Sequence, residues 1–128
     1  MNENPISSTD ILIGIIYFSP KGKRFFNYDS ERFYRFFYGQ RDSHPNLLGR
    51  IRFDWDGRYP TSPDLSESIE NLFAGCMLMA PHSNPSRYIF NEEACECYFS
   101  RNLKDLPDER LKEIQDLSSK FQEELMPK

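Results

Sequence analysis

Three cysteines and a nearby histidine carry the most specific chemistry in this chain of 128 residues. Cys95 and Cys97 form a C-x-C pair, and Cys76 and His82 lie earlier, so four ligands that zinc accepts are present. On a helix, residues two positions apart point about 200° apart, because each residue advances by roughly 100°. Structural zinc sites use wider spacings. The spacing therefore predicts packed free thiols and no metal or other cofactor.

No other set of residues has the pattern of a catalytic site. His44 and His82 each lie close to a proline and have no accompanying nucleophile motif, so we expect both on surface loops. Lys21-Gly22-Lys23 lacks the spacing of a phosphate-binding loop and reads as a turn. The sequence predicts that this protein is not an enzyme.

Composition places the chain among ordinary globular proteins. Aromatic residues make up 15% of the chain, so we expect a core built largely from rings. No apolar run is long enough to span a membrane. An odd number of cysteines without a secretion signal predicts reduced thiols in a cytoplasmic protein.

Two helices and a strand are expected in the first half of the chain, after a flexible segment at residues 1–7. Ser8 or Thr9 can cap a helix through the apolar run 11–18, although a buried strand fits the same run. Asp29 is a suitable cap for a helix at 30–39 whose phenylalanines lie on one face. Residues 40–49 read as a loop or a short turn of helix. Alternating side chains then predict a strand from Arg50 to Trp55, closed by a turn at Asp56-Gly57.

The second half predicts three helices and a two-stranded ribbon. Ser62 and Pro63 begin a helix that ends near Phe73. Met77–Met79 and Arg87–Phe90 are expected to pair as antiparallel strands around a turn-rich tip. Asn91 caps a further helix, and an amphipathic helix occupies 107–125. The predicted fold class is α+β, with four to five helices and a small antiparallel sheet in a single domain at 8–128.

The region from Phe53 to Ile89 adds a family resemblance. The resemblance rests on the run Phe53-Asp54-Trp55-Asp56-Gly57-Arg58-Tyr59-Pro60-Thr61-Ser62-Pro63-Asp64-Leu65, and on Ile69, Leu72, Gly75-Cys76-Met77-Leu78 and Tyr88-Ile89. This pattern resembles winged-helix domains of the Panacea antitoxin type. The resemblance implies a winged-helix-like fold in a prokaryotic protein. It also implies a role in toxin neutralisation, as an adaptor, or in a defence-associated complex.

Charge decides between the two kinds of partner that such a domain takes. Residues 20–58 hold nine basic and five acidic side chains, whereas residues 59–128 hold seven basic and thirteen acidic ones. The helix that would read DNA exposes Asp64, Glu67 and Glu70 and has no lysine or arginine, and DNA affinity depends on neutralising phosphates. We therefore expect another protein, a toxin or complex subunit, as the partner, with a DNA-binding transcriptional regulator as the alternative. The candidate partner-binding residues are Arg32, Tyr34, Arg35, Tyr38, Arg50, Arg52 and Arg58.

Overall fold

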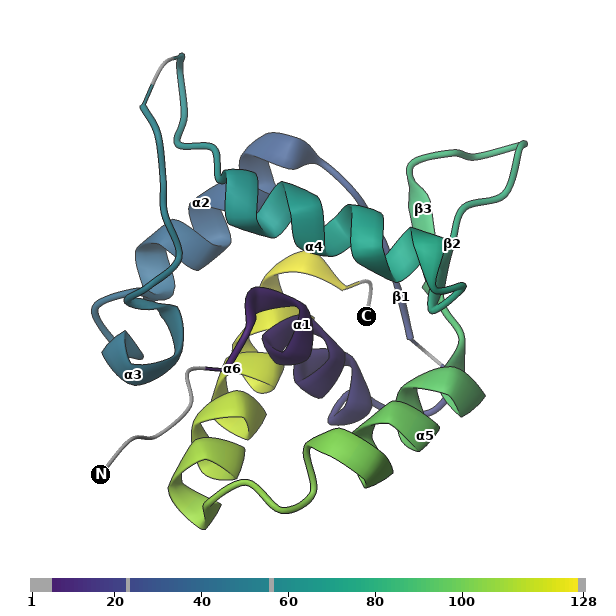
Figure 1. Cartoon of the computed structure of the whole chain (residues 1–128). Helices are drawn as coiled ribbons and strands as arrows, with labels where there is room; N and C mark the ends of the chain where they lie inside the picture. The colour runs from purple at the N-terminus through teal and green to yellow at the C-terminus, as the bar shows by residue number, and fades with distance from the viewer. Residues whose placement is uncertain (1–5, 23, 56, 127–128) are drawn as a thin grey trace.

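The computed structural model describes residues 6–22, 24–55 and 57–126. Within these residues the elements are α1 (Ser8–Tyr17), β1 (Phe25–Asn27), α2 (Ser30–Gln40), α3 (Pro45–Leu48), α4 (Pro63–Ala74), β2 (Leu78–Met79), β3 (Arg87–Phe90), α5 (Glu92–Asn102) and α6 (Asp108–Leu125) (Figure 1). The α+β class is confirmed, with six helices and a three-stranded sheet among the described residues. The helix beyond the expected four to five is the single turn α3.

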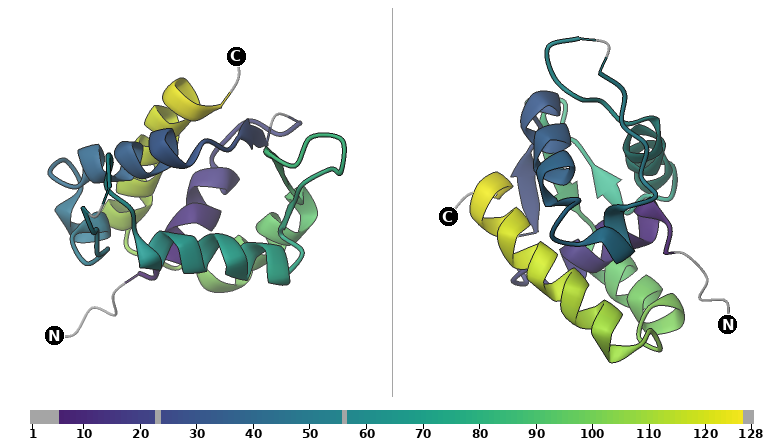
Figure 2. Two further views of the ribbon diagram at one scale, coloured as in Figure 1. Left: turned by 90° about the horizontal axis from the view of Figure 1, so that it is seen from above. Right: turned by 90° about the vertical axis from the view of Figure 1, so that its left-hand side faces the viewer.

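α1 lies at the centre of the molecule and is apolar on nearly every side. Ile11 to Ile16 are all buried, which settles the helix-or-strand alternative for this run in favour of a helix. α4, α5 and α6 pack around it, as the two views in Figure 2 show. A helix that is hydrophobic all round must be covered on all sides. The other helices therefore take their positions from α1.

Aromatic rings fill the core beside α1. Phe26, Phe33 and Phe37 are each no more than 2% exposed. Phe121 of α6 meets Phe26 edge-on, with ring centroids 5.3 Å apart. Edge-to-face rings gain energy beyond the area that they bury.

The helix starts follow from short polar caps. Asp29, Ser62 and Asn91 each accept a hydrogen bond from a backbone N–H in the first turn of their helices, as predicted. α1 is capped by Ser7, one residue before the expected Ser8. Of the expected flexible segment 1–7, residues 1–5 lie outside the described residues. Lys23 of the expected turn at 21–23 and Asp56 of the expected turn at Asp56-Gly57 also lie outside them.

The predicted ribbon is present. β2 pairs antiparallel with β3, with Leu78 opposite Phe90. β1, which the sequence analysis missed, pairs with the other edge of β3 and gives the order β1-β3-β2. A strand of three residues has almost no periodicity, and its pairing partner lies some sixty residues later in the chain, so local pattern could not reveal it.

The predicted strand from Arg50 to Trp55 is wrong. Only an isolated bridge forms there, between Asp54 and Thr61. Ile51 is buried, Phe53 is half-buried and Trp55 is 54% exposed, so the alternating apolar row rises out of the core. Phe53 and Trp55 pack against Tyr38 of α2, and no strand among the described residues lies alongside to extend the sheet.

None of the described helices is both long and apolar enough to cross a membrane. α6 is the longest of them, and it is the amphipathic helix predicted at 107–125. Its buried face carries Ile114, Leu117 and Phe121. Ser118 on the same face donates a hydrogen bond to the carbonyl oxygen of Ile15 at 2.6 Å, which fixes α6 against α1.

The contact between Gly14 of α1 and Ile114 of α6 gives a test of this packing. A Cβ at Gly14 would lie 2.7 Å from Cγ2 of Ile114, whereas a Cβ at Gly39 of α2 would meet nothing within 4 Å. We expect Gly14→Ala to lower the free energy of unfolding by about 1–3 kcal/mol through overpacking. Gly39→Ala, the control, should raise it by about 0.5–1 kcal/mol through helix propensity.

Urea unfolding measures both effects. Adding Ile114→Leu, which removes the β-branch, should recover part of the loss in Gly14→Ala. If Gly14→Ala proves as stable as the wild type, the close contact between α1 and α6 is contradicted.

Candidate functional site

Four side chains form what we term the aromatic–arginine cluster: Tyr38 of α2, Arg41 at the C-cap of α2, and Phe53 and Trp55 of the loop after α3. The Tyr38 ring meets Phe53 and Trp55 edge-on, at centroid distances of 5.3 and 5.6 Å. The Arg41 guanidinium lies 5.1 Å from the centre of the Tyr38 ring. Tyr38 is 38% and Trp55 is 54% exposed. Tryptophan, tyrosine and arginine are the residue types that most often dominate the energy of protein interfaces.

The loop at 49–62 holds this cluster in place through bonds on both sides of Trp55. Asp54 and Thr61 exchange two backbone hydrogen bonds, of 2.8 and 2.9 Å. The Tyr59 hydroxyl lies 2.8 Å from that of Ser30, at the start of α2. The loop projects beyond the N-terminal end of α4 (Figure 1). A loop with this many fixed points loses less entropy on binding a partner.

Arginine pairs add two further ties. The Glu31 carboxylate forms salt bridges with two guanidinium groups, that of Arg35 at 3.0 Å and that of Arg58 at 3.5 Å. Arg35 also donates a hydrogen bond to the backbone carbonyl of Arg58, at 3.1 Å. The loop is thereby joined to the exposed side of α2.

The other tie joins the loop to α4. Both side-chain and backbone N–H groups of Arg52 bond to the Asp64 carboxylate, the shortest contacts being 2.8 Å. The hydrogen bond from the Arg52 side chain, with that from its backbone, holds the pKa of Asp64 below its ordinary value. The sequence analysis counted Asp64 as an exposed acid of this helix. In the structure its carboxylate is bonded to Arg52 instead.

The predicted partner-binding residues divide into three groups. Arg35, Arg58 and Tyr38 lie close together on α2 and the loop. Arg32, Arg50 and Arg52 are also exposed, but Arg32 bonds to the C-terminal end of α6 and Arg52 to α4. Tyr34 is only 8% exposed, so it does not lie on the exposed surface with the others. Its position on α2 places it with Phe33 and Phe37 on the buried face.

Trp55, Phe53 and Arg41 were missed. Phe53 and Trp55 fell within the strand predicted from Arg50 to Trp55, which does not form. Trp55 is the single tryptophan of the chain, and it is more exposed than the half-buried Phe53 that precedes it in the loop. One sequence feature could have indicated this exposure. The alternating apolar residues end at Trp55, directly before the expected turn at Asp56-Gly57, and turns lie at the surface.

α4 and the ribbon tip offer almost no positive charge. On α4, the exposed residues include Glu67, Glu70 and Asn71, and the helix has no lysine or arginine. Residues 80–86 of the tip also lack both. Arg87, at the base of the tip, lies over the Phe25 ring, 4.1 Å from its centre. This face therefore lacks the cations that bind phosphates.

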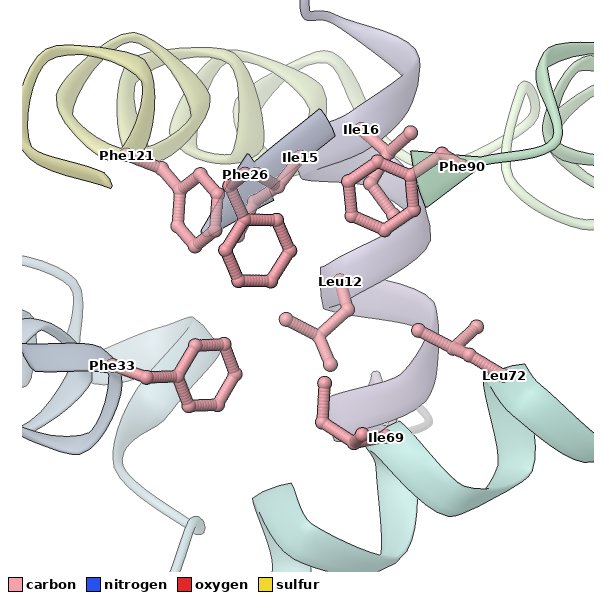
Figure 3. A pocket seen from close by; sticks show the side chains of 9 residues that line it. All are labelled: Leu12, Ile15, Ile16, Phe26, Phe33, Ile69, Leu72, Phe90 and Phe121. Carbon is pink, nitrogen blue, oxygen red and sulfur yellow. The ribbon is translucent and has the colours of Figure 1, made fainter. Parts of the chain in front are cut away.

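The core holds a small apolar cavity of about 10 Å³ beside α1 (Figure 3). Its lining residues are Leu12, Ile15, Ile16, Phe26, Phe33, Ile69, Leu72, Phe90 and Phe121. None of these side chains has a polar atom, and the volume is about that of one water probe. The cavity is a gap in the packing and has no group that could carry acid–base or nucleophilic chemistry.

The described thiols and histidines do not come together in a common site. Cys95 is fully buried, where desolvation raises the pKa of its thiol to about 11, and Cys76 and Cys97 are exposed. Among the described residues no three histidine, cysteine or acidic side chains are arranged to hold a metal ion. His82 is exposed as expected, but the surface position expected for His44 was wrong. His44 is 5% exposed, and its Nε2 lies 3.0 Å from an Asp116 carboxylate oxygen on α6.

No family model, no curated protein and no solved structure matches this chain.

The sole tryptophan reports directly on the cluster. We expect Trp55 fluorescence to be that of a solvent-exposed indole, with high steady-state anisotropy because Tyr38 restrains the ring. Tyr38→Ala should lower the anisotropy and increase quenching by acrylamide. Met79→Ala, which removes another exposed side chain, on the ribbon, should change neither. An emission spectrum typical of a buried indole, or equal anisotropy in all three proteins, would contradict the cluster.

The Arg52–Asp64 pair predicts a pH dependence. Because the pKa of Asp64 is lowered in the folded protein, the pair stabilises the fold above the pKa of the unfolded chain, about 3.9. That stabilisation is lost as the pH falls through the lower, folded-state value. The difference in unfolding free energy between wild type and Arg52→Gln should therefore shrink below pH ~4.

The control is Arg50→Gln, because Arg50 is exposed and forms no polar contact with any described residue. Its effect on stability should not depend on pH. A wild-type advantage over Arg52→Gln that persists unchanged well below the unfolded-state pKa would rule out this pair as its source.

Proposed function

We propose that this protein is a non-enzymatic, winged-helix-like module that docks onto another protein through the aromatic–arginine cluster. The observation that carries the proposal is the contrast between two surfaces. The cluster exposes a restrained tryptophan beside tyrosine and arginine. α4 and the ribbon tip, the surface through which a winged helix reads DNA, have no lysine or arginine.

The order of elements supports the winged-helix-like architecture. α4 leads directly into the antiparallel ribbon of β2 and β3, and β1 completes the sheet on the far edge of β3. The tip at 81–86 projects from the body as a wing does (Figure 1). The expected first strand at 50–55 is replaced in this arrangement by β1, which comes before α2.

Electrostatics favours a protein partner over a duplex. Glu67 and Glu70 lie on the exposed side of α4, form no ion pair with any described residue, and would repel phosphates. The net charge of −4 gives no long-range attraction to a polyanion. The resemblance to Panacea-type domains narrows the proposed partner to a toxin or to a subunit of a defence-associated complex.

Site-specific cross-linking tests the docking surface in the native host. A photoreactive benzoyl-phenylalanine at position 55 keeps an aromatic ring there. The same residue at Gln115, which is exposed on α6, serves as the control. We expect a discrete protein adduct from position 55 that position 115 does not give. Adducts of equal yield from both positions, or none from position 55, would reject this surface.

Duplex DNA provides the opposing test. Fluorescence anisotropy with labelled duplexes at physiological salt should give weak binding without sequence preference. Tight, sequence-selective binding that is lost on substitution of exposed α4 residues would instead support a transcriptional regulator.

A further inference from the structure

His44 is a buried histidine at the junction between the two halves of the aromatic–arginine cluster. It follows α2, which carries Tyr38, and precedes α3, which leads into the loop at 49–62. Its backbone N–H donates to the carbonyl oxygen of Gln40 at 3.0 Å, and its carbonyl oxygen accepts hydrogen bonds from Leu47 and Leu48 in α3. The residue is therefore tied to both elements that position the cluster.

The imidazole ring of His44 faces two carboxylates of α6. Nε2 lies 3.0 Å from Oδ2 of Asp116, and Nδ1 lies 4.0 Å from Oε2 of Glu113. A neutral imidazole has one N–H and one lone pair, so one nitrogen would present its lone pair to a carboxylate. The shorter contact also lacks the alignment of a hydrogen bond, which leaves Nε2 buried without a hydrogen-bond partner among the described residues. What this geometry offers is attraction between charges, and that requires a protonated ring.

Two cations of α6 complete the charged surroundings of the ring. Arg110 lies 3.1 Å from Oε1 of Glu113, and Lys120 lies 3.4 Å from Oδ2 of Asp116. On the side of α2 and α3, no acidic side chain of a described residue lies within ion-pair distance of the ring. Burial and the two cations disfavour the charged ring, whereas the two carboxylates favour it.

We propose that the carboxylates prevail, because they contact the ring directly, and that His44 is a proton-operated latch between α3 and α6. The protonated ring is attracted to both carboxylates and fixes the start of α3 against α6. α3 in turn holds the loop, because the Ile51 N–H donates to the carbonyl oxygen of Leu48 at 3.1 Å. Loss of the proton removes this attraction, so the loop that carries Trp55 becomes less restrained. The latch makes the docking surface most rigid in mildly acidic solution, and this consequence rests on the proposed function.

Urea unfolding and Trp55 anisotropy across a pH series test the latch. Histidine is the side chain that ordinarily changes charge between about pH 5 and 8, and the chain has two histidines. His44→Gln removes the latch. His82→Gln removes the other histidine, which is exposed on the ribbon tip, and is the matched control. Asp116→Asn keeps the buried ring and removes the nearer carboxylate, which is itself exposed.

The sign of the effect follows from the protonated ring being the form that the fold favours. Its stabilisation is complete at the acidic end of the series and is lost as the pH rises. Between the alkaline and the acidic end, we expect the unfolding equilibrium of the wild type, relative to His44→Gln, to shift roughly threefold or more toward the folded state, within the limit of about tenfold per pH unit for one proton. Trp55 anisotropy should rise over the same range. His82→Gln should follow the wild type, whereas Asp116→Asn should lose most of the dependence.

The latch is rejected if the advantage of the wild type over His44→Gln is the same at every pH, or if it grows toward alkaline pH. The second result would mean that burial keeps the ring neutral. Full pH dependence in Asp116→Asn would also reject the latch. A change in stability without any change in Trp55 anisotropy rejects the link between His44 and the docking surface.

This test and the cross-linking experiment fail separately. A protein adduct at position 55 together with a flat pH series leaves the docking function standing and rejects the latch. A pH series that behaves as expected, without an adduct specific for position 55, rejects the docking function and leaves His44 as a latch of the fold.

Discussion

The burial of α1 on all sides is the constraint on which the rest of the structure depends. A helix with six consecutive buried residues can be stable only if other elements cover its whole circumference. Its few polar groups are used to orient those elements. Asp10 accepts a hydrogen bond from the Tyr98 hydroxyl of α5, Ser8 bonds to α4, and the buried guanidinium of Arg24 caps the carbonyl of Tyr17 at 2.9 Å.

This arrangement explains why the aromatic–arginine cluster is on the surface. α2 packs its phenylalanine face inward, which leaves Arg32, Arg35 and Tyr38 outside. The chain must then travel from α3 to the start of α4, and the loop at 49–62 makes this connection over the outer face of α2. Along this loop the apolar residues become steadily more exposed, from the buried Ile51 through Phe53 to Trp55. The exposed Trp55 is therefore a result of how the loop is anchored and not of a packing failure.

The sequence predicted the elements whose determinants are local. Caps at Asp29, Ser62 and Asn91, the apolar stripe of α6 and the two strands of the ribbon all depend on residues within a few positions of one another. β1 could not be predicted because its strand identity exists only through pairing with β3. The strand predicted at 50–55 failed for the converse reason, since its alternation is real but no partner strand lies beside it. Tyr34, His44 and Trp55 were misplaced because exposure depends on which face of an element the whole fold covers.

A restrained Trp55 resting on Tyr38 is the central claim, and nuclear magnetic resonance tests it most directly, because the chain has a single indole N–H signal. The account predicts a heteronuclear Overhauser effect for this group close to that of the helical backbone, with proton contacts to the Tyr38 ring. An indole with the values of a mobile side chain and no contact to Tyr38 would contradict a preformed docking surface.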